Sequence, residues 1–72
     1  MPYIKIELTR EEVTKEKKEQ LIKGVTELIT NVLNKDPYLT HVVIQEFDLD
    51  NWGYGGQQVT ELRAQGITAD KK

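Results

Sequence analysis

The 72-residue sequence lacks cysteine and contains a single histidine, His41. Without cysteine the chain has no disulfides and no thiolate metal ligands, and one histidine argues against a closed zinc site made of protein ligands. A hydrophobic core of this size supplies only about 3–5 kcal/mol, so small domains without such cross-links commonly rely on oligomerisation. We therefore expect no bound metal and a homo-oligomer.

Long apolar runs and patches of basic charge are also missing. No segment approaches the roughly 20 apolar residues of a membrane helix, and the N-terminus has neither the basic nor the apolar region of a signal peptide. Ten basic against twelve acidic side chains give a net charge of −2, and residues 24–62 hold six acids against Lys35 alone. A nucleic acid would find no basic face to bind. These absences predict a cytoplasmic protein with neither a membrane nor a nucleic-acid partner.

Hydrophobic periodicity predicts a strand followed by a long helix. Apolar and charged side chains alternate over residues 2–8, which is typical of a strand with one buried face. Thr14 is a suitable helix N-cap, and Asn34 followed by Asp36-Pro37 indicates where the helix ends. Between them, apolar residues recur at spacings of one, three and four and predict a broad apolar stripe: Leu21, Ile22, Val25, Leu28, Ile29, Val32 and Leu33.

A second strand is predicted over residues 40–47, where Val42-Val43-Ile44 is apolar on both faces, as in a central strand. Two strands joined by a helix form a βαβ unit with parallel strands and a right-handed crossover. A glycine-rich hairpin or loop then covers residues 52–56, residues 57–65 form a short helix or strand, and residues 66–72 form a frayed tail. The predicted fold class is α/β (α+β), with one domain over residues 1–72.

A single helix covers only one face of such a two-stranded sheet, so we expect the other face to meet a partner subunit. Ile4, Ile6 and the strand around Val43 are equally compatible with a position between subunits or within one. The uncovered face is a second reason to expect self-association.

Pro2 is the residue with the most chemical content. Aminopeptidases usually remove an initiator methionine that precedes a small residue such as proline, so the mature chain is expected to begin with a secondary amine. An α-amino group titrates closer to neutrality than lysine does. Burial or a nearby cation lowers its pKa further, which makes it a usable general base at neutral pH. On position alone, Pro2 is also readily explained as a strand-edge residue at the start of a chain.

Four features follow one another along the chain: Pro2, the helix from Thr14 to Leu33, the segment Val43-Ile44-Gln45-Glu46, and the aromatic-Gly-x-Gly-Gly run from Trp52 to Gly56. In this order and spacing they resemble the 4-oxalocrotonate tautomerase family over about residues 1–60. The resemblance implies a tautomerase-like fold assembled as a homohexamer, usually a trimer of dimers. It also implies a cofactor-independent keto–enol isomerase that acts on a 2-keto acid or a related enol.

By this resemblance, Pro2 is the general acid and base that moves a proton between the enol and its 2-keto acid. Trp52 then corresponds to the aromatic wall that helps lower the pKa of the proline, although it also suits a core or interface position. Members of the family bind the substrate carboxylate and polarise its carbonyl with two arginines.

The positions of those two arginines differ in this sequence. Val13 stands where the first one precedes the helix, next to a short insertion, and Arg10 reaches the site only if this insertion loops it inward. His41 stands where the second one begins the strand. It can donate a hydrogen bond but lacks the bidentate fork of arginine, and a strand histidine is often structural. Arg63 is a further candidate cation, supplied by a neighbouring subunit. These residues favour a substrate with one carboxylate, or a neutral enol, over a dicarboxylate.

The remaining motifs carry weaker signals. Glu11 and Glu12 are predicted to be a solvated surface pair, and Gly53-x-Gly55-Gly56 is predicted to form turns with positive φ rather than a dinucleotide site. Two other functions stay open. One is a proline-assisted hydratase or dehalogenase of an unsaturated acid, in which Glu11, Glu12 or Asp50 activates water. The other is a non-catalytic oligomeric module whose acidic surface meets a protein partner.

Overall fold

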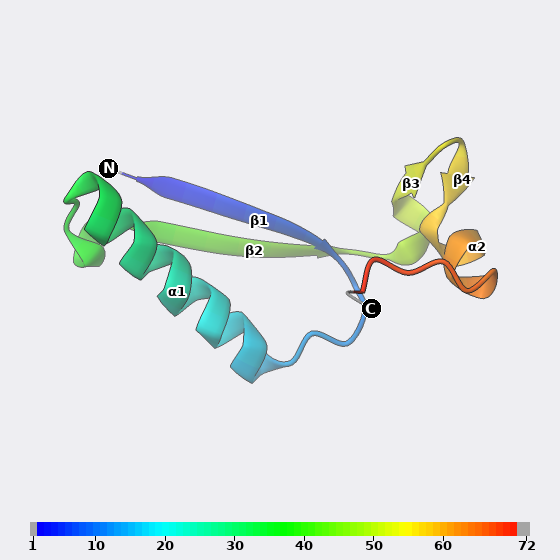
Figure 1. Ribbon diagram of the computed structural model, residues 1–72, viewed down its shortest axis with the longest axis horizontal. Coiled ribbons are helices and arrows are strands. Elements are labelled where there is room, and N and C mark those ends of the chain that lie inside the picture. The colour runs from blue at the N-terminus through cyan, green and yellow to red at the C-terminus, as the bar shows by residue number, and fades with distance from the viewer. Residues whose placement is uncertain (1, 71–72) are drawn as a thin grey trace.

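The computed structural model describes residues 2–70, which form a βαβ unit followed by a small C-terminal arm, residues 52–70 (Figure 1). The helices and strands follow the order predicted from the sequence, with two added 3-10 turns. Their bounds are β1 Tyr3–Thr9, α1 Lys15–Leu33, η1 Pro37–Leu39, β2 His41–Phe47, η2 Leu49–Asn51, β3 Gly53–Tyr54, β4 Gln57–Gln58 and α2 Val59–Ala64.

Both ends of α1 lie where the capping residues predict. The hydroxyl oxygen of Thr14 accepts a hydrogen bond from the Lys17 backbone N–H at 3.2 Å and satisfies one of the free donors of the first turn. Asn34 adopts the left-handed conformation, with φ of 55° and ψ of 43°. Asparagine tolerates this conformation better than most residues, so it ends the helix at low cost.

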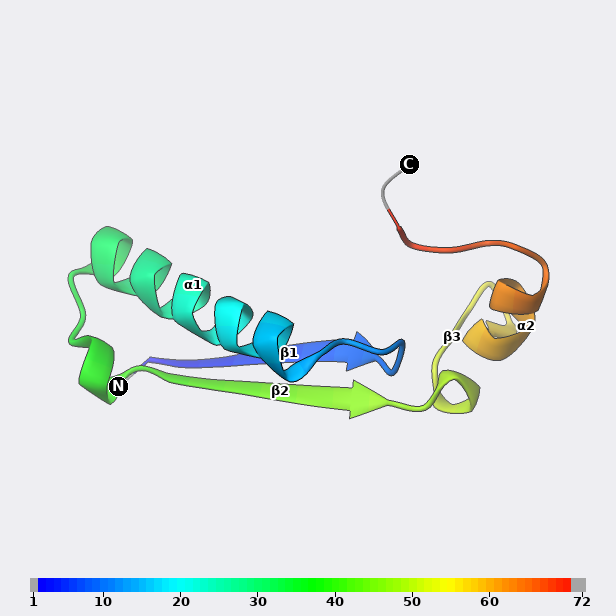
Figure 2. The ribbon, with the colours of Figure 1, turned by 90° about the horizontal axis from the view of Figure 1, so that it is seen from below.

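The strands β1 and β2 pair in parallel, in a register that runs from Tyr3 opposite His41 to Thr9 opposite Phe47. The helix α1 is the crossover between them and lies over one face of the sheet (Figure 2). An ion pair between Lys18 of α1 and Glu46 of β2 joins the helix to that face. The half-buried strand residues that alternate with exposed ones share the face: Ile4, Ile6, Leu8, Val42, Ile44 and Glu46.

The opposite face of the sheet is open. Tyr3 and Val43 are 62% and 40% exposed there, and His41 is exposed on the same face. As expected for a sheet with a single helix, only one face of β2 is covered within one chain, and the cover expected on its other face from a partner subunit stays a prediction. Ile4 and Ile6 belong to the helix-covered face, and the exposed side chain of Val43 lies on the open one.

The glycine-rich segment forms a tight hairpin, as predicted. Gly53 pairs with Gln58 and Tyr54 with Gln57, and the two residues between the strands, Gly55 and Gly56, have φ of 63° and 80°. Two successive residues with positive φ are the requirement of a type I′ turn. Gly53 is needed for another reason, because a Cβ atom there would lie 2.7 Å from the backbone oxygen of Gln57. Residues 57–65 prove to be both a strand and a helix.

The fully buried part of the described chain is small and lies in the arm rather than under the sheet. Val59 and Leu62 of α2 are 1% and 4% exposed. The radius of gyration is 15.2 Å and the long axis measures 44 Å, whereas a compact domain of this length has a radius of gyration of roughly 11 Å. The isolated chain is thus extended, and much of its apolar surface faces outward.

The predicted tail has no regular secondary structure over residues 66–70, although the Ile67 N–H donates to the Leu62 carbonyl at 2.9 Å. Residues 71–72, which complete that prediction, lie outside the described residues, as does Met1.

Candidate active site

The predicted site residues fall into two groups at opposite ends of β1. Pro2 directly precedes β1, and its carbonyl oxygen accepts a hydrogen bond from the His41 backbone N–H at 3.0 Å. Parallel pairing therefore places Pro2 and His41 side by side where the two strands begin. The arm with Trp52 and Arg63 lies beyond the other end of the strands (Figure 1). Since β1 has seven residues, the two groups are about 20 Å apart.

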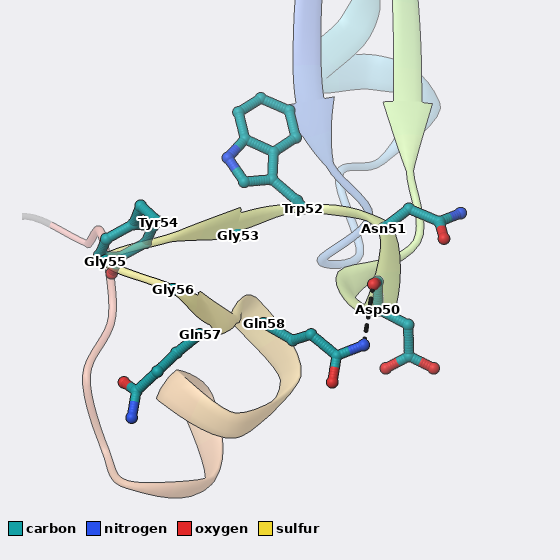
Figure 3. A pocket seen from close by; sticks show the side chains of 9 residues that line it. All are labelled: Asp50, Asn51, Trp52, Gly53, Tyr54, Gly55, Gly56, Gln57 and Gln58. Atoms are coloured by element: carbon teal, nitrogen blue, oxygen red, sulfur yellow. Dashed lines mark hydrogen bonds between the residues drawn. The ribbon is translucent and has the colours of Figure 1, made fainter.

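Trp52 is the first residue of the arm and lies next to the end of the sheet. Its ring meets Phe47 edge to face, with 5.8 Å between the ring centroids and an interplanar angle of 71°. Its carbonyl oxygen accepts a hydrogen bond from the Val59 N–H at 2.8 Å, which ties it to the buried end of α2. In Figure 3 the indole points away from Gln57 and Gln58 and back toward the strands. The ring contact with Phe47 and the backbone hydrogen bond to α2 thus hold Trp52 at the end of the sheet.

A cavity of about 340 Å³ lies beside the Trp52 ring, between the end of β1 and the arm. Its wall includes Trp52, Tyr54 and Arg63 from the arm and Glu7 from β1. A larger hollow of about 510 Å³ follows the hairpin from Asp50 to Gln58 (Figure 3), where the Gln58 side chain donates to the Asp50 carbonyl at 3.0 Å. Only the smaller cavity combines an aromatic wall with a cation, so it is the stronger candidate for binding an organic anion.

Arg63 is held by contacts from two parts of the chain. Its Nε and Nη2 atoms donate to the two carboxylate oxygens of Glu11, the second at 3.3 Å, and its Nη1 donates to the Ile67 carbonyl at 2.9 Å. Glu11 also accepts a hydrogen bond from the Thr9 hydroxyl. The Arg63 side chain is 17% exposed and that of Glu11 is 36% exposed. The pair therefore fastens the arm to the loop between β1 and α1.

These contacts shift both acid–base equilibria. Hydrogen bonds from Arg63 and then Thr9 lower the pKa of Glu11 below its usual value. The bond to Glu11 raises the pKa of Arg63, and Tyr54 adds to the rise. Both side chains are consequently charged at neutral pH. Glu11 and Glu12 are both exposed, as predicted for a surface pair, but Glu11 also pairs with a residue 52 positions away, and Glu12 has φ of 61°.

Arg10 lies at the same end of the strands but in a different environment. Its backbone N–H donates to the Phe47 carbonyl at 2.7 Å, and its Nη1 donates to Asp48 at 2.6 Å. The two side chains are 59% and 62% exposed. Arg10 thus joins the ends of β1 and β2 just before the turn that leads to Trp52, and its role in substrate binding stays a prediction.

Glu11 and Asp48 are partners that the sequence reasoning did not assign. Local patterns do not reveal them, because the first pairs across 52 residues and the second across 38. Their only sequence signal is that each lies within two residues of the end of a strand, where chain ends meet in space. Within residues 2–70, no group of three potential metal-ligating side chains occurs, and no helix is long and apolar enough to cross a membrane.

The lowered pKa of Glu11 predicts a pH-dependent stability. A carboxyl group with a lower pKa in the folded state stabilises the fold above its unfolded pKa, near 4.3, and loses that contribution as the pH falls through the folded pKa. Glu11→Gln is therefore expected to lower the melting temperature near neutral pH but not in strong acid. Thermal unfolding at both pH values measures this, with Glu12→Gln as the matched control. An equal effect of both substitutions would contradict the assigned pairing.

Comparison with known proteins agrees with this architecture. The family described as "Tautomerase enzyme" matches residues 2–62. The chain is 51% identical over 65 residues to "Probable tautomerase K2" of Dickeya dadantii, covering 90% of this chain and 97% of the relative. It is 46% identical over 65 residues to a "Probable tautomerase" of Helicobacter pylori, covering 88% and 96% of the two chains.

Solved structures show the same fold. The crystal structure of DmpI from Helicobacter pylori superposes with a TM-score of 0.82 at 45% identity, covering 88% of this chain and 97% of the other. A 4-oxalocrotonate tautomerase isozyme structure from Methylibium petroleiphilum superposes with a TM-score of 0.83 at 23% identity, covering 89% and 98%, which is a likeness of fold. The chain belongs to the tautomerase family.

Proposed function

We propose that this tautomerase interconverts the enol and keto forms of a 2-keto acid or a related enol, with the amine of Pro2 as general base and acid. The amine takes the proton of the enol hydroxyl, the electron pair moves through the double bond, and the protonated amine returns the proton to carbon. One O–H bond breaks and one C–H bond forms, so no cofactor enters the balance. The observation that supports this proposal is the backbone hydrogen bond between Pro2 and His41, because it brings near the proposed base a residue whose imidazole can donate a hydrogen bond.

The separation of Pro2 from Trp52 supports a site built from more than one copy of the chain. A small substrate cannot touch two residues about 20 Å apart, so a site that uses both takes them from different subunits. The open sheet face with Tyr3 and Val43 and the extended shape of the single chain favour the same conclusion. We propose a homo-oligomer, specifically a homohexamer, with Trp52 of one subunit as the apolar wall beside Pro2 of another.

Arg63 in the arm and His41 in β2 suit substrate binding. Arg63 lines the same cavity as Trp52, so we assign it the substrate carboxylate. His41 begins β2 beside Pro2 and is proposed to donate a hydrogen bond to the substrate oxygen. Arg10 is the weaker candidate for direct contact, because its guanidinium already binds Asp48.

The contacts of the acidic residues favour tautomerisation over the alternative of hydration. Activation of water requires a carboxylate that is free to accept a proton. Glu11 is occupied by Arg63, and Asp50 accepts a hydrogen bond from the Thr60 hydroxyl. Two of the three carboxylates that suit that role on sequence grounds are therefore engaged in structural contacts.

The proposal is tested by following the ketonisation of an aryl enolpyruvate by ultraviolet absorbance. Protein whose intact mass shows that it begins at Pro2 is expected to act well above the buffer rate. Protein that retains Met1 is expected to be inactive, because the nitrogen of Pro2 is then an amide without a basic electron pair. Equal rates for the two forms would exclude the amine of Pro2 as the base.

A further inference from the structure

The contacts of Arg63 bear on which substrates the cavity accepts. We propose that Glu11 is a specificity-determining residue, which makes the cavity beside Trp52 favour substrates with one carboxylate over substrates with two. The inference rests on the proposed function, since it concerns the substrate of the same site. Glu11 contacts Arg63 and affects the choice of substrate through that contact.

Arg63 has few hydrogen-bond donors left for a substrate. A guanidinium carries five N–H groups. The contacts with Glu11 and with the Ile67 carbonyl use three of them among the described residues, and the side chain of Tyr54, in the same cavity wall, is a further hydrogen-bond partner of Arg63. At most two N–H groups, one on each terminal nitrogen, are left for a substrate. Two donors are enough for one carboxylate and too few for two.

Acidic side chains outnumber basic ones around the cavity. Arg63 and Glu7 are the charged residues of its described wall, and Glu11 is bonded to Arg63 from the loop. Within one chain, one positive and two negative charges therefore lie around the space. A first carboxylate on the substrate meets Arg63, but a second one finds no further cation in this wall and faces Glu7 and Glu11. Like charges at such short range disfavour binding.

Removal of the charge of Glu11 changes this balance. In Glu11→Gln the region around the cavity loses one negative charge. The Nε and Nη2 atoms of Arg63 then lose their ionic partner. A second carboxylate then has a favourable site. We expect affinity for a dicarboxylate to rise about tenfold, while affinity for a monocarboxylate changes by less than about threefold.

Binding can be measured without turnover, because Trp52 is the only tryptophan of the chain and lines the cavity. Benzoate and isophthalate serve as matched probes with one and two carboxylates, titrated at constant ionic strength while the fluorescence of Trp52 is recorded. The wild-type protein is expected to prefer benzoate. Glu11→Gln is expected to shift the ratio of the two dissociation constants about tenfold toward isophthalate.

Two further variants separate specificity from folding. Glu12→Gln makes the same charge change one residue away and is expected to keep the wild-type ratio. Glu11→Asp keeps the negative charge and is also expected to keep it, so it reports on the charge even if Glu11→Gln does not fold. The proposal is overturned if Glu12→Gln or Glu11→Asp shifts the ratio as much as Glu11→Gln does. It is also overturned if the wild-type protein prefers isophthalate or responds to neither probe.

This binding ratio is independent of the chemistry assigned to Pro2. If the ratio shifts as expected but the protein shows no ketonisation, the proposed reaction fails and the role of Glu11 stands. If ketonisation depends on Pro2 but the ratio does not respond to Glu11, the reaction stands and the role of Glu11 fails.

Discussion

Replacement of Pro2 by alanine is expected to lower kcat for ketonisation by a factor of about 10² or more, within the range for loss of a positioned general base. An N-terminal alanine also carries an amine, but it is a primary amine without the ring that restricts the conformation of proline. The fold should not change, because the carbonyl oxygen at position 2, which accepts from the His41 N–H, is kept. Stopped-flow or steady-state ultraviolet assays on mass-confirmed protein measure the loss.

The chain contains a matched control for this substitution. Its only other proline, Pro37, begins η1 after α1, so Pro37→Ala removes the same ring at a position without a proposed chemical role. Wild-type activity is expected for Pro37→Ala. Full activity in Pro2→Ala, or equal losses in the two variants, would exclude Pro2 as the catalytic residue.

Two impaired variants are expected to regain activity when they are mixed. Trp52→Ala alone should lower kcat/KM by roughly 10- to 100-fold, since a large buried apolar side chain contributes about 1.5–3 kcal/mol. If each site takes Pro2 from one copy and Trp52 from another, random assembly of Pro2→Ala and Trp52→Ala chains restores both residues in about a quarter of the sites. Unfolding the variants together in urea, refolding them and assaying the mixture measures this recovery.

The control for the mixing experiment is each variant unfolded and refolded by itself. The mixture is expected to exceed the sum of these two activities severalfold. A mixture that stays at that sum would show that Pro2 and Trp52 do not complement each other across subunits, and would contradict a site shared between copies.

The fold was predictable from sequence wherever short-range patterns determine it. The alternation in β1, the stripe of α1, the caps at Thr14 and Asn34 and the Gly55–Gly56 turn each depend on neighbouring residues. The 3-10 turn η1 was not predicted, because three residues are too few to show a periodic pattern. A hydrogen bond from the Tyr38 N–H to the Asp36 side chain caps this turn.

The site was less predictable, because its geometry depends on contacts between distant positions. The adjacency of Pro2 and His41 is a matter of register between parallel strands, which no local pattern specifies. Pairing of Arg63 with Glu11 depends on how the arm folds back after η2. Parallel pairing, which the sequence did predict, sends the chain after β2 away from Pro2, so Pro2 and Trp52 of one chain lie at opposite ends of the sheet.

The open face of the sheet couples the stability of this protein to its amount. When other copies cover an apolar face, mass action joins folding and assembly, and the free energy of unfolding grows with protomer concentration. The proposed oligomer would then have no single melting temperature, because each dilution defines a new one. With Pro2 and Trp52 on different chains, catalysis would fail at the same dilution as assembly, so activity per chain would fall when the protein becomes scarce.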